Sequence, residues 1–120
     1  MGYRPVESSR LYERAEGLVD AVWDLASQWP EFARRTVGLQ IVRAADSIGA
    51  NIAEGSGRFH PADVCKFLYY ARGSLREPKF FLRRAERRGL LTTESFQKLD
   101  ADVEQVSREL NAFINFQKSR

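Results

Sequence analysis

Residues 37–57 read VGLQIVRAADSIGANIAEGSG, and this stretch decides the fold class. Its apolar side chains recur three or four residues apart, which places them on one face of an α-helix. The face consists of Val37, Ile41, Ala45, Ile48 and Ile52. The pattern stops at Gly55-Ser56-Gly57, where a glycine can take the left-handed conformation that closes many helices. The stretch therefore predicts an amphipathic helix over residues 35–55.

Three further stretches show the same helical spacing. The four helices are predicted over residues 9–29, 35–55, 61–88 and 93–117. The other apolar faces consist of Leu11, Ala15, Leu18, Val22, Leu25 and Trp29; of Val64, Leu68, Ala71, Leu75, Leu82 and Ala85; and of Phe96, Leu99, Val103, Val106, Leu110 and Phe113. The end signals are an N-cap at Ser8 or Ser9, Pro30, Pro61 at a helix start, Gly89, and an N-cap at Thr92 or Thr93. Short connections predict an all-α, antiparallel up-down four-helix bundle that forms one domain over residues 1–120, with frayed ends at residues 1–7 and 118–120.

Pro78 disagrees with the helix that contains it. A proline inside a helix removes a backbone donor and crowds the carbonyl four residues earlier. Because Gly73-Ser74 comes just before it, we expect the third helix to be kinked or broken near Ser74–Pro78. The apolar face stays in phase across this point, which favours a kink over two shorter helices that meet there.

The composition is that of a globular protein, with 43% hydrophobic and 29% charged residues. No apolar run approaches the roughly 20 residues that span a bilayer, and residues 1–10 show no export signal. Cys65 is the single cysteine and can form no internal disulfide. We therefore expect a cytoplasmic protein without membrane contact, in which Cys65 is a small buried side chain.

No group of residues predicts catalysis. His60 is the one histidine, and no cysteine, histidine or carboxylate cluster with metal-ligand spacing surrounds it. Gly55-Ser56-Gly57 follows a helix and lacks the Gly-Lys-Ser/Thr end of a phosphate loop. We predict no enzyme activity, no catalytic residue, no metal and no cofactor, with His60 in an exposed loop.

The charge is uneven along the chain. Residues 34–88 hold twelve basic and five acidic side chains, a net +7, whereas residues 1–33 hold three basic and six acidic ones, a net −3. On the third helix, one flank of the apolar face carries Tyr69, Arg72, Arg76, Lys79, Arg83 and Arg87. Arginines and an aromatic ring in a row suit the phosphates and bases of RNA or DNA. The alternative is a solvated face that pairs with the acidic first helix through Glu13, Glu16, Asp20 and Asp24.

A second row, polar in character, follows the second helix. It consists of Gln40, Arg43, Ser47, Asn51, Glu54 and Arg58. The row predicts a subunit interface or a channel; the alternatives are an ordinary solvated face, or an Arg43/Asn51/Glu54 network that sets the helix register. Aromatic residues outside both rows indicate apolar surface that another subunit covers, and hence a homo-oligomer. These residues are Trp23, Tyr70, Phe80, Phe81 and Phe116.

Residues 39–55, LQIVRAADSIGANIAEG, resemble the signature Q-x-x-R-A-x-x-S-I-x-x-N-I-A-E-G of a protein family encoded in intervening sequences of bacterial large-subunit ribosomal RNA genes. A second similarity lies at residues 67–77, FLYYARGSLRE, and the resemblance spans about Leu11 to Phe116. Where the family usually has Glu-Leu-Glu, this chain has Glu77-Pro78-Lys79, which puts the straightness of the third helix in doubt.

The resemblance implies a four-helix bundle that assembles into a homopentamer and has no known reaction. A distantly similar bundle, the accessory protein of diversity-generating retroelements, is a basic pentamer that partners a reverse transcriptase and nucleic acid. The expected partners are therefore other copies of the chain and RNA or DNA. The alternative is an adaptor for a nucleic-acid enzyme, with no direct nucleic-acid contact.

Overall fold

The computed structural model describes the backbone of residues 6–120 and the side chains from residue 10 onward. Every regular element in this range is helical. The elements are α1 (Val6–Ala26), α2 (Glu31–Ala33), the π-helical segment η1 (Arg34–Gly38), α3 (Leu39–Ser56), α4 (Pro61–Ser74), α5 (Arg76–Arg87) and α6 (Thr93–Lys118). Because α2, η1 and α3 follow without a gap, the chain forms four helical rods, with α4 and α5 making the third.

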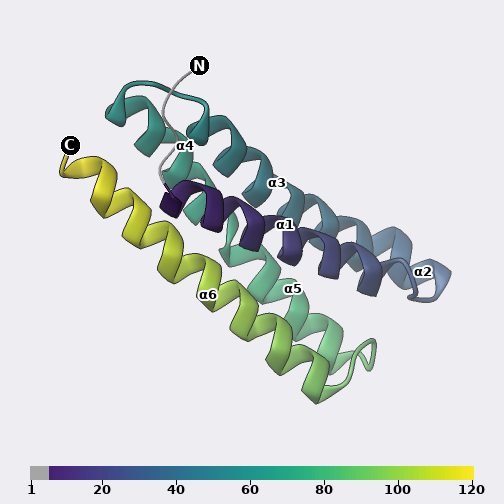
Figure 1. Cartoon of the computed structure of the whole chain (residues 1–120). Coiled ribbons are helices and arrows are strands. Elements are labelled where there is room, and N and C mark those ends of the chain that lie inside the picture. The colour runs from purple at the N-terminus through teal and green to yellow at the C-terminus, as the bar shows by residue number, and fades with distance from the viewer. Residues whose placement is uncertain (1–5) are drawn as a thin grey trace.

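The four rods form an antiparallel bundle, as predicted. Figure 1 shows α1 and α3 side by side and running in opposite directions, with α4–α5 and α6 paired in the same way. Helix α3 also contacts α4, and α6 also contacts α1, so the rods close into a ring of neighbours around one core. Each helix therefore buries one face and exposes the opposite face to solvent.

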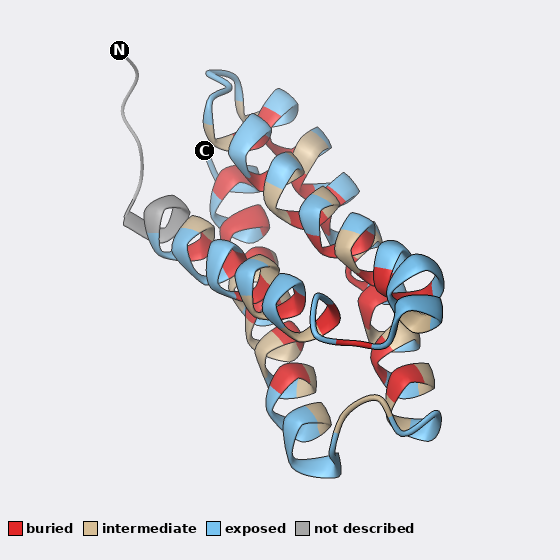
Figure 2. Cartoon of the chain, turned by 90° about the vertical axis from the view of Figure 1, so that its right-hand side faces the viewer, coloured by how far each residue is buried: buried red, intermediate tan, exposed pale blue. Residues whose placement is uncertain are grey.

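The predicted apolar faces make this core. In Figure 2 the buried positions, coloured red, lie mostly on the sides of the helices that face one another. Among the residues predicted for these faces, all are buried except Leu25 and Phe96, which are partly buried against the core. Cys65 is buried too, as expected for a small apolar side chain. The spacing of apolar residues was thus sufficient to predict the core-facing side of every rod.

The ends of the first rod differ from the prediction. Helix α1 begins at Val6, so Ser8 and Ser9 lie inside it, and the N-cap expected there is wrong. It ends at Ala26 rather than at residue 29. The side chains of Ser27 and Gln28 both donate to the Asp24 carbonyl, at 3.0 and 2.9 Å, and replace the next helical bond there. Most of the predicted N-terminal fraying falls at residues 1–5, outside the described residues.

The second rod begins at Glu31, four residues before the predicted start. Pro30 takes the extended conformation of an N-cap, with φ −55° and ψ 155°, so the chain re-enters a helix at once. The rod ends at Ser56, but Gly57 has φ −85°, and the expected left-handed closure is wrong. Gly55 instead allows a close approach, because a Cβ there would lie 3.2 Å from both Phe67 Cβ and the Val64 carbonyl oxygen.

The third rod is broken within the predicted stretch. Helix α4 ends at Ser74, Leu75 interrupts, and α5 begins at Arg76, so two shorter helices meet there. Pro78 becomes the third residue of α5. The first backbone N–H groups of a helix have no intrahelical acceptor, and a proline at that position therefore removes no hydrogen bond. The break allows Pro78 to be buried in the core without interrupting α5.

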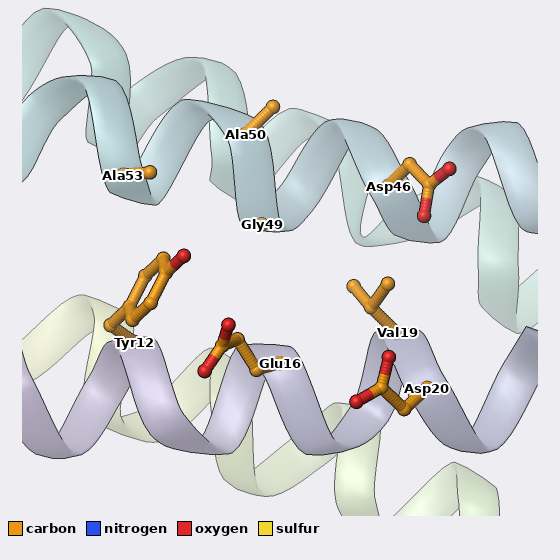
Figure 3. A pocket seen from close by; sticks show the side chains of 8 residues that line it. All are labelled: Tyr12, Glu16, Val19, Asp20, Asp46, Gly49, Ala50 and Ala53. Atoms are coloured by element: carbon orange, nitrogen blue, oxygen red, sulfur yellow. The ribbon is translucent and has the colours of Figure 1, made fainter.

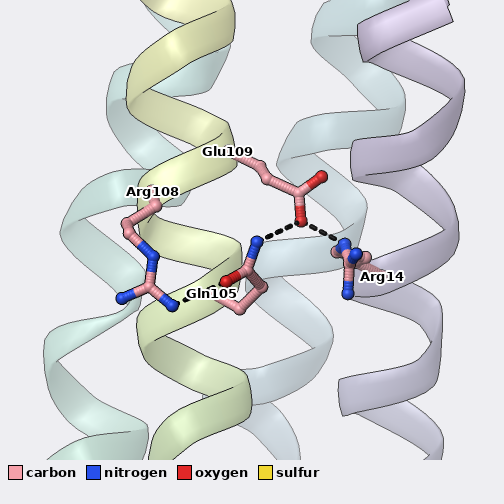
Figure 4. Close-up of polar contacts among 4 residues, drawn as sticks. All are labelled: Arg14, Gln105, Arg108 and Glu109. Atoms are coloured by element: carbon pink, nitrogen blue, oxygen red, sulfur yellow. Dashed lines mark hydrogen bonds and ion pairs between the residues drawn. The ribbon is translucent and has the colours of Figure 1, made fainter.

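Polar contacts join the rods at their edges. In Figure 4, Glu109 of α6 accepts from Arg14 of α1 and from Gln105, which in turn accepts from Arg108 at 2.6 Å. On the opposite side of the bundle, the hydroxyls of Ser47 and Ser74 lie 3.0 Å apart and join α3 to the end of α4. No helix within residues 6–120 is long and apolar enough to cross a membrane.

Candidate nucleic-acid interface

The basic row on α4 and α5 divides into free and engaged cations. Arg76, Arg83 and Arg87 are exposed, and no carboxylate among the described residues pairs with any of them. They project from α5 at intervals of seven and four residues, so they share one side of the helix. Arginine is always charged and presents a rigid fork of donors, so these three side chains can bind an anion outside the chain.

Arg72 and Lys79, in contrast, are turned toward α6. Arg72 Nη1 donates to Asn111 Oδ1 at 3.2 Å, and its guanidinium carbon lies 4.9 Å from the centroid of the Tyr69 ring. Lys79 Nζ pairs with Glu104 and lies 3.6 Å from the Asp100 carboxylate. The acidic partner of the row is therefore α6, and pairing with the first helix, the alternative considered from the sequence, is wrong for these two cations.

The ion pair shifts the proton affinity of both its partners. The hydrogen bond from Lys79 holds the pKa of the Glu104 carboxyl below its ordinary value of 4.5. The same bond raises the pKa of Lys79 above 10.5, against the opposing effect of partial burial. Lys79 thus stays charged at neutral pH, with two carboxylates of α6 beside it.

Phe80 lies within the row, although the sequence reading placed it outside. It follows Arg76 by four residues and precedes Arg83 by three, which makes it a neighbour of both on the surface of α5. Its side chain is 59% exposed. The guanidinium carbon of Arg84 lies 5.8 Å from its ring centroid. The helical spacing alone would have placed Phe80 in the basic row. Because Phe80 is apolar, it was interpreted from the sequence as part of a subunit contact instead.

The polar row of α3 is partly built into the bundle. Ser47 contacts Ser74 of α4 and so joins two rods within one chain, whereas Asn51 Nδ2 donates to the Ser47 carbonyl of its own helix at 2.9 Å. Glu54 pairs with Arg58 at 2.9 Å. Asn51 and Glu54 therefore bind other partners instead of joining one network with Arg43. Gln40 and Arg43 are exposed on the surface of α3.

A groove of about 250 Å³ lies between α1 and α3. Figure 3 shows its lining: Tyr12, Glu16, Val19, Asp20, Asp46, Gly49, Ala50 and Ala53. Three of these side chains are carboxylates, and no ion pair within the described residues involves them. A phosphate would be repelled there, so this side of the bundle does not suit a nucleic acid.

The remaining chemically versatile residues lie apart. His60 is the exposed N-cap residue of α4, with its ring edge-on to Phe59 at 5.3 Å between centroids, and Cys65 is buried. Among the described residues, no three histidine, cysteine or acidic side chains are grouped closely enough to hold a metal ion. The arrangement that remains for function is a surface of exposed cations.

Comparison with known proteins points in one direction. The model of the 23S rRNA-intervening sequence protein family matches residues 7–112. No curated protein matches the chain. The fold is similar to the crystal structure of a protein of unknown function from the S23 ribosomal protein family of Bacteroides thetaiotaomicron, with a TM-score of 0.84 and 22% identity over 92% of this chain and 99% of that chain. At that identity the likeness concerns the fold alone.

Proposed function

The chain belongs to the family of 23S rRNA-intervening sequence proteins, and we propose that it is a non-enzymatic, homo-oligomeric bundle that binds RNA or DNA through the basic face of α4 and α5. The observation that carries the proposal is the set of three exposed arginines on α5 without a carboxylate partner among the described residues. Guanidinium groups bind phosphate oxygens in a fork, and each contact releases counterions from the nucleic acid.

The length of the row suits a polyanion. Arg76 and Arg87 are eleven residues apart on one helix, a separation of about 16 Å at 1.5 Å per residue. Phosphates of a duplex strand follow one another every 3.4 Å along the axis, so the row reaches over several of them. A single small anion would leave most of these arginines without a ligand.

The test is charge reversal on this face. The Arg76→Glu/Arg83→Glu variant should stay folded, because both side chains are exposed, and should bind a ribosomal RNA fragment much more weakly at low salt. The matched control is Arg34→Glu/Lys98→Glu, which makes the same charge change at two exposed positions on other helical segments. Affinity for the RNA fragment is measured by fluorescence anisotropy over a salt series. Equal affinity of the two variants would show that α5 is not the nucleic-acid interface.

Self-association is the second part of the proposal. Large apolar side chains stand in solvent on the isolated chain, among them Phe32 at 81%, Phe59 at 77% and Trp23 at 60% exposure. Such surface is usually covered in the working assembly. The family resemblance suggests a pentamer, with Gln40 and Arg43 of the polar row facing a neighbouring subunit. Light scattering that returns the mass of one chain at every concentration would contradict this part.

The same three rings support a second candidate function. None of them lies on α5, so a protein partner could cover them while the arginines remain free. The chain would then be an adaptor for a nucleic-acid enzyme. A pull-down that returns one protein after nuclease treatment, and that is lost on Phe32→Ser but not on Arg76→Glu/Arg83→Glu, would favour the adaptor.

A further inference from the structure

The basic row contains an aromatic ring that the fold does not require. Phe80 is 59% exposed, while the buried residues of α5 are Pro78, Leu82 and Ala85. Its ring lies at 5.3 Å and 75° to that of Phe81, which packs partly buried against the core. This edge-to-face contact with Phe81 restrains the Phe80 ring on one side and leaves much of the ring exposed to solvent. The ring is thus both supported by a neighbour and accessible.

Cations surround this ring. Arg76 and Arg83 flank it along the helix, and the guanidinium of Arg84 lies 5.8 Å from its centroid. Arg84 Nε is buried and has no hydrogen-bond partner among the described residues, so the ring of Phe80 is a contact of this guanidinium that involves no carboxylate. Further along the row, Tyr69 is 39% exposed beside Arg72. Two exposed rings, Tyr69 and Phe80, therefore stand among the cations of this face.

We propose that Phe80, assisted by Tyr69, stacks on unpaired bases, so that the ligand of the α4–α5 face is single-stranded nucleic acid. This inference rests on the function proposed above and names its substrate class. Proteins that bind single strands combine a positive track for the backbone with aromatic rings on which bases stack, and this face has both components.

A duplex fits these observations less well. Its bases already stack on one another, and it presents phosphates and groove edges to the protein surface. An exposed phenylalanine in the middle of the arginines would gain little from such a backbone. A protein partner or a second copy of the chain would need an apolar pocket for Phe80 ringed by several carboxylates to match the cations around it. A strand with unpaired bases supplies the ring faces and the negative charge together.

The experiment compares two probes and two variants. The probes are a 20-nucleotide oligouridine RNA and a blunt RNA duplex of the same length. Phe80→Leu keeps an apolar side chain and the full charge but removes the ring. Stacking on one ring corresponds to an affinity change of about ten-fold, so the variant should bind the single strand about ten-fold more weakly and the duplex unchanged. Phe80→Trp should bind the single strand at least as well as the original chain.

The matched control is Leu39→Ala, which shortens an exposed apolar side chain on α3 and should change neither affinity. The salt dependence should be the same for Phe80→Leu and the original chain, because no charge is removed. Unchanged single-strand affinity, an equal loss on both probes, or a lower mass in light scattering for Phe80→Leu would each overturn the inference. If only the charge-reversed arginine variant loses binding, the proposed function stands and the stacking role fails; if that variant loses none, the proposed function fails.

Discussion

The outward face of α5 and the groove between α1 and α3 carry opposite charges, and neither is neutralised by the other. On α5, three exposed arginines lack a carboxylate partner among the described residues; in the groove, Glu16, Asp20 and Asp46 lack a cation in the same range. The bundle therefore separates its charges by face. Charge that the fold does not use for its own stability remains available for partners outside the chain.

A second contrast lies inside the basic row. Arg83 is exposed to solvent, whereas Lys79, four residues earlier, pairs with Glu104 and lies near Asp100. Neighbouring cations of one helix thus differ: Lys79 is paired within the chain, and Arg83 is free to bind a ligand outside it. What decides between them is the position of α6, whose acidic side chains reach one flank of α5 only.

The largest predicted effect is on the salt dependence of nucleic-acid binding, and it compares Arg83 with Lys79. Arg83→Gln should make the slope of log K against log salt shallower by about 0.7 on a single strand, because one phosphate contact is lost. Lys79→Gln should change the slope less, since α6 already holds that ammonium. Titrations of both variants from about 50 to about 300 mM salt give the two slopes. Equal slopes would mean that Lys79 leaves α6 when the ligand binds.

A smaller effect is expected from the groove. Neutralising it with Glu16→Gln, Asp20→Asn and Asp46→Asn removes a repulsive field without touching α5, so nucleic-acid affinity should rise a few-fold at low salt. The gain should vanish as the screening length falls from about 30 Å at 0.01 M salt to about 10 Å at 0.1 M. A gain that persists at the higher salt would show that the groove itself contacts the ligand.

The smallest effect concerns the Lys79–Glu104 pair. The lowered pKa of Glu104 stabilises the fold above pH 4.5, and this stability is lost as the pH falls through the folded pKa. The raised pKa of Lys79 stabilises the fold below pH 10.5, and this stability is lost as the pH rises through the folded pKa. The stability difference between the original chain and Lys79→Met should therefore be greatest between these limits. It should be small, because the two side chains are 38% and 47% exposed.

Urea midpoints at a series of pH values measure this difference. The control is Lys98→Met, which removes an exposed ammonium that has no ion pair among the described residues. A difference that stays constant from acid to alkaline pH would show that Lys79 acts through packing of its stem and not through its charge.

Periodicity predicted the rods and their buried faces because each depends on residues close together in the sequence. A disturbance near Pro78 was also predictable, since the proline and Gly73-Ser74 are local signals, but the in-phase apolar face had favoured a kink over the two shorter helices that meet there. The end of α1 was missed because competing bonds to the Asp24 carbonyl, donated by Ser27 and Gln28, stop the helix before Pro30 does.

The candidate site was harder to predict than the fold. The row of cations follows from spacing on one helix, but which of them are engaged depends on α6, more than twenty residues away in the sequence for Lys79 and Glu104. Ser47 and Ser74, also distant in the sequence, meet because α3 and α4 are neighbours in the bundle. Such contacts depend on which helices become neighbours, and a one-dimensional pattern does not contain that information.

Few positions of α5 lie in the core, so most of this helix can change in sequence during evolution. Only Pro78, Leu82 and Ala85 of its twelve residues are buried, so selection for folding acts on few positions of this helix. The exposed side chains of α5 can be exchanged with little effect on the core. A lineage could therefore acquire a new ligand by substituting the outward residues of one helix, and descendants with the same architecture need not share a binding partner.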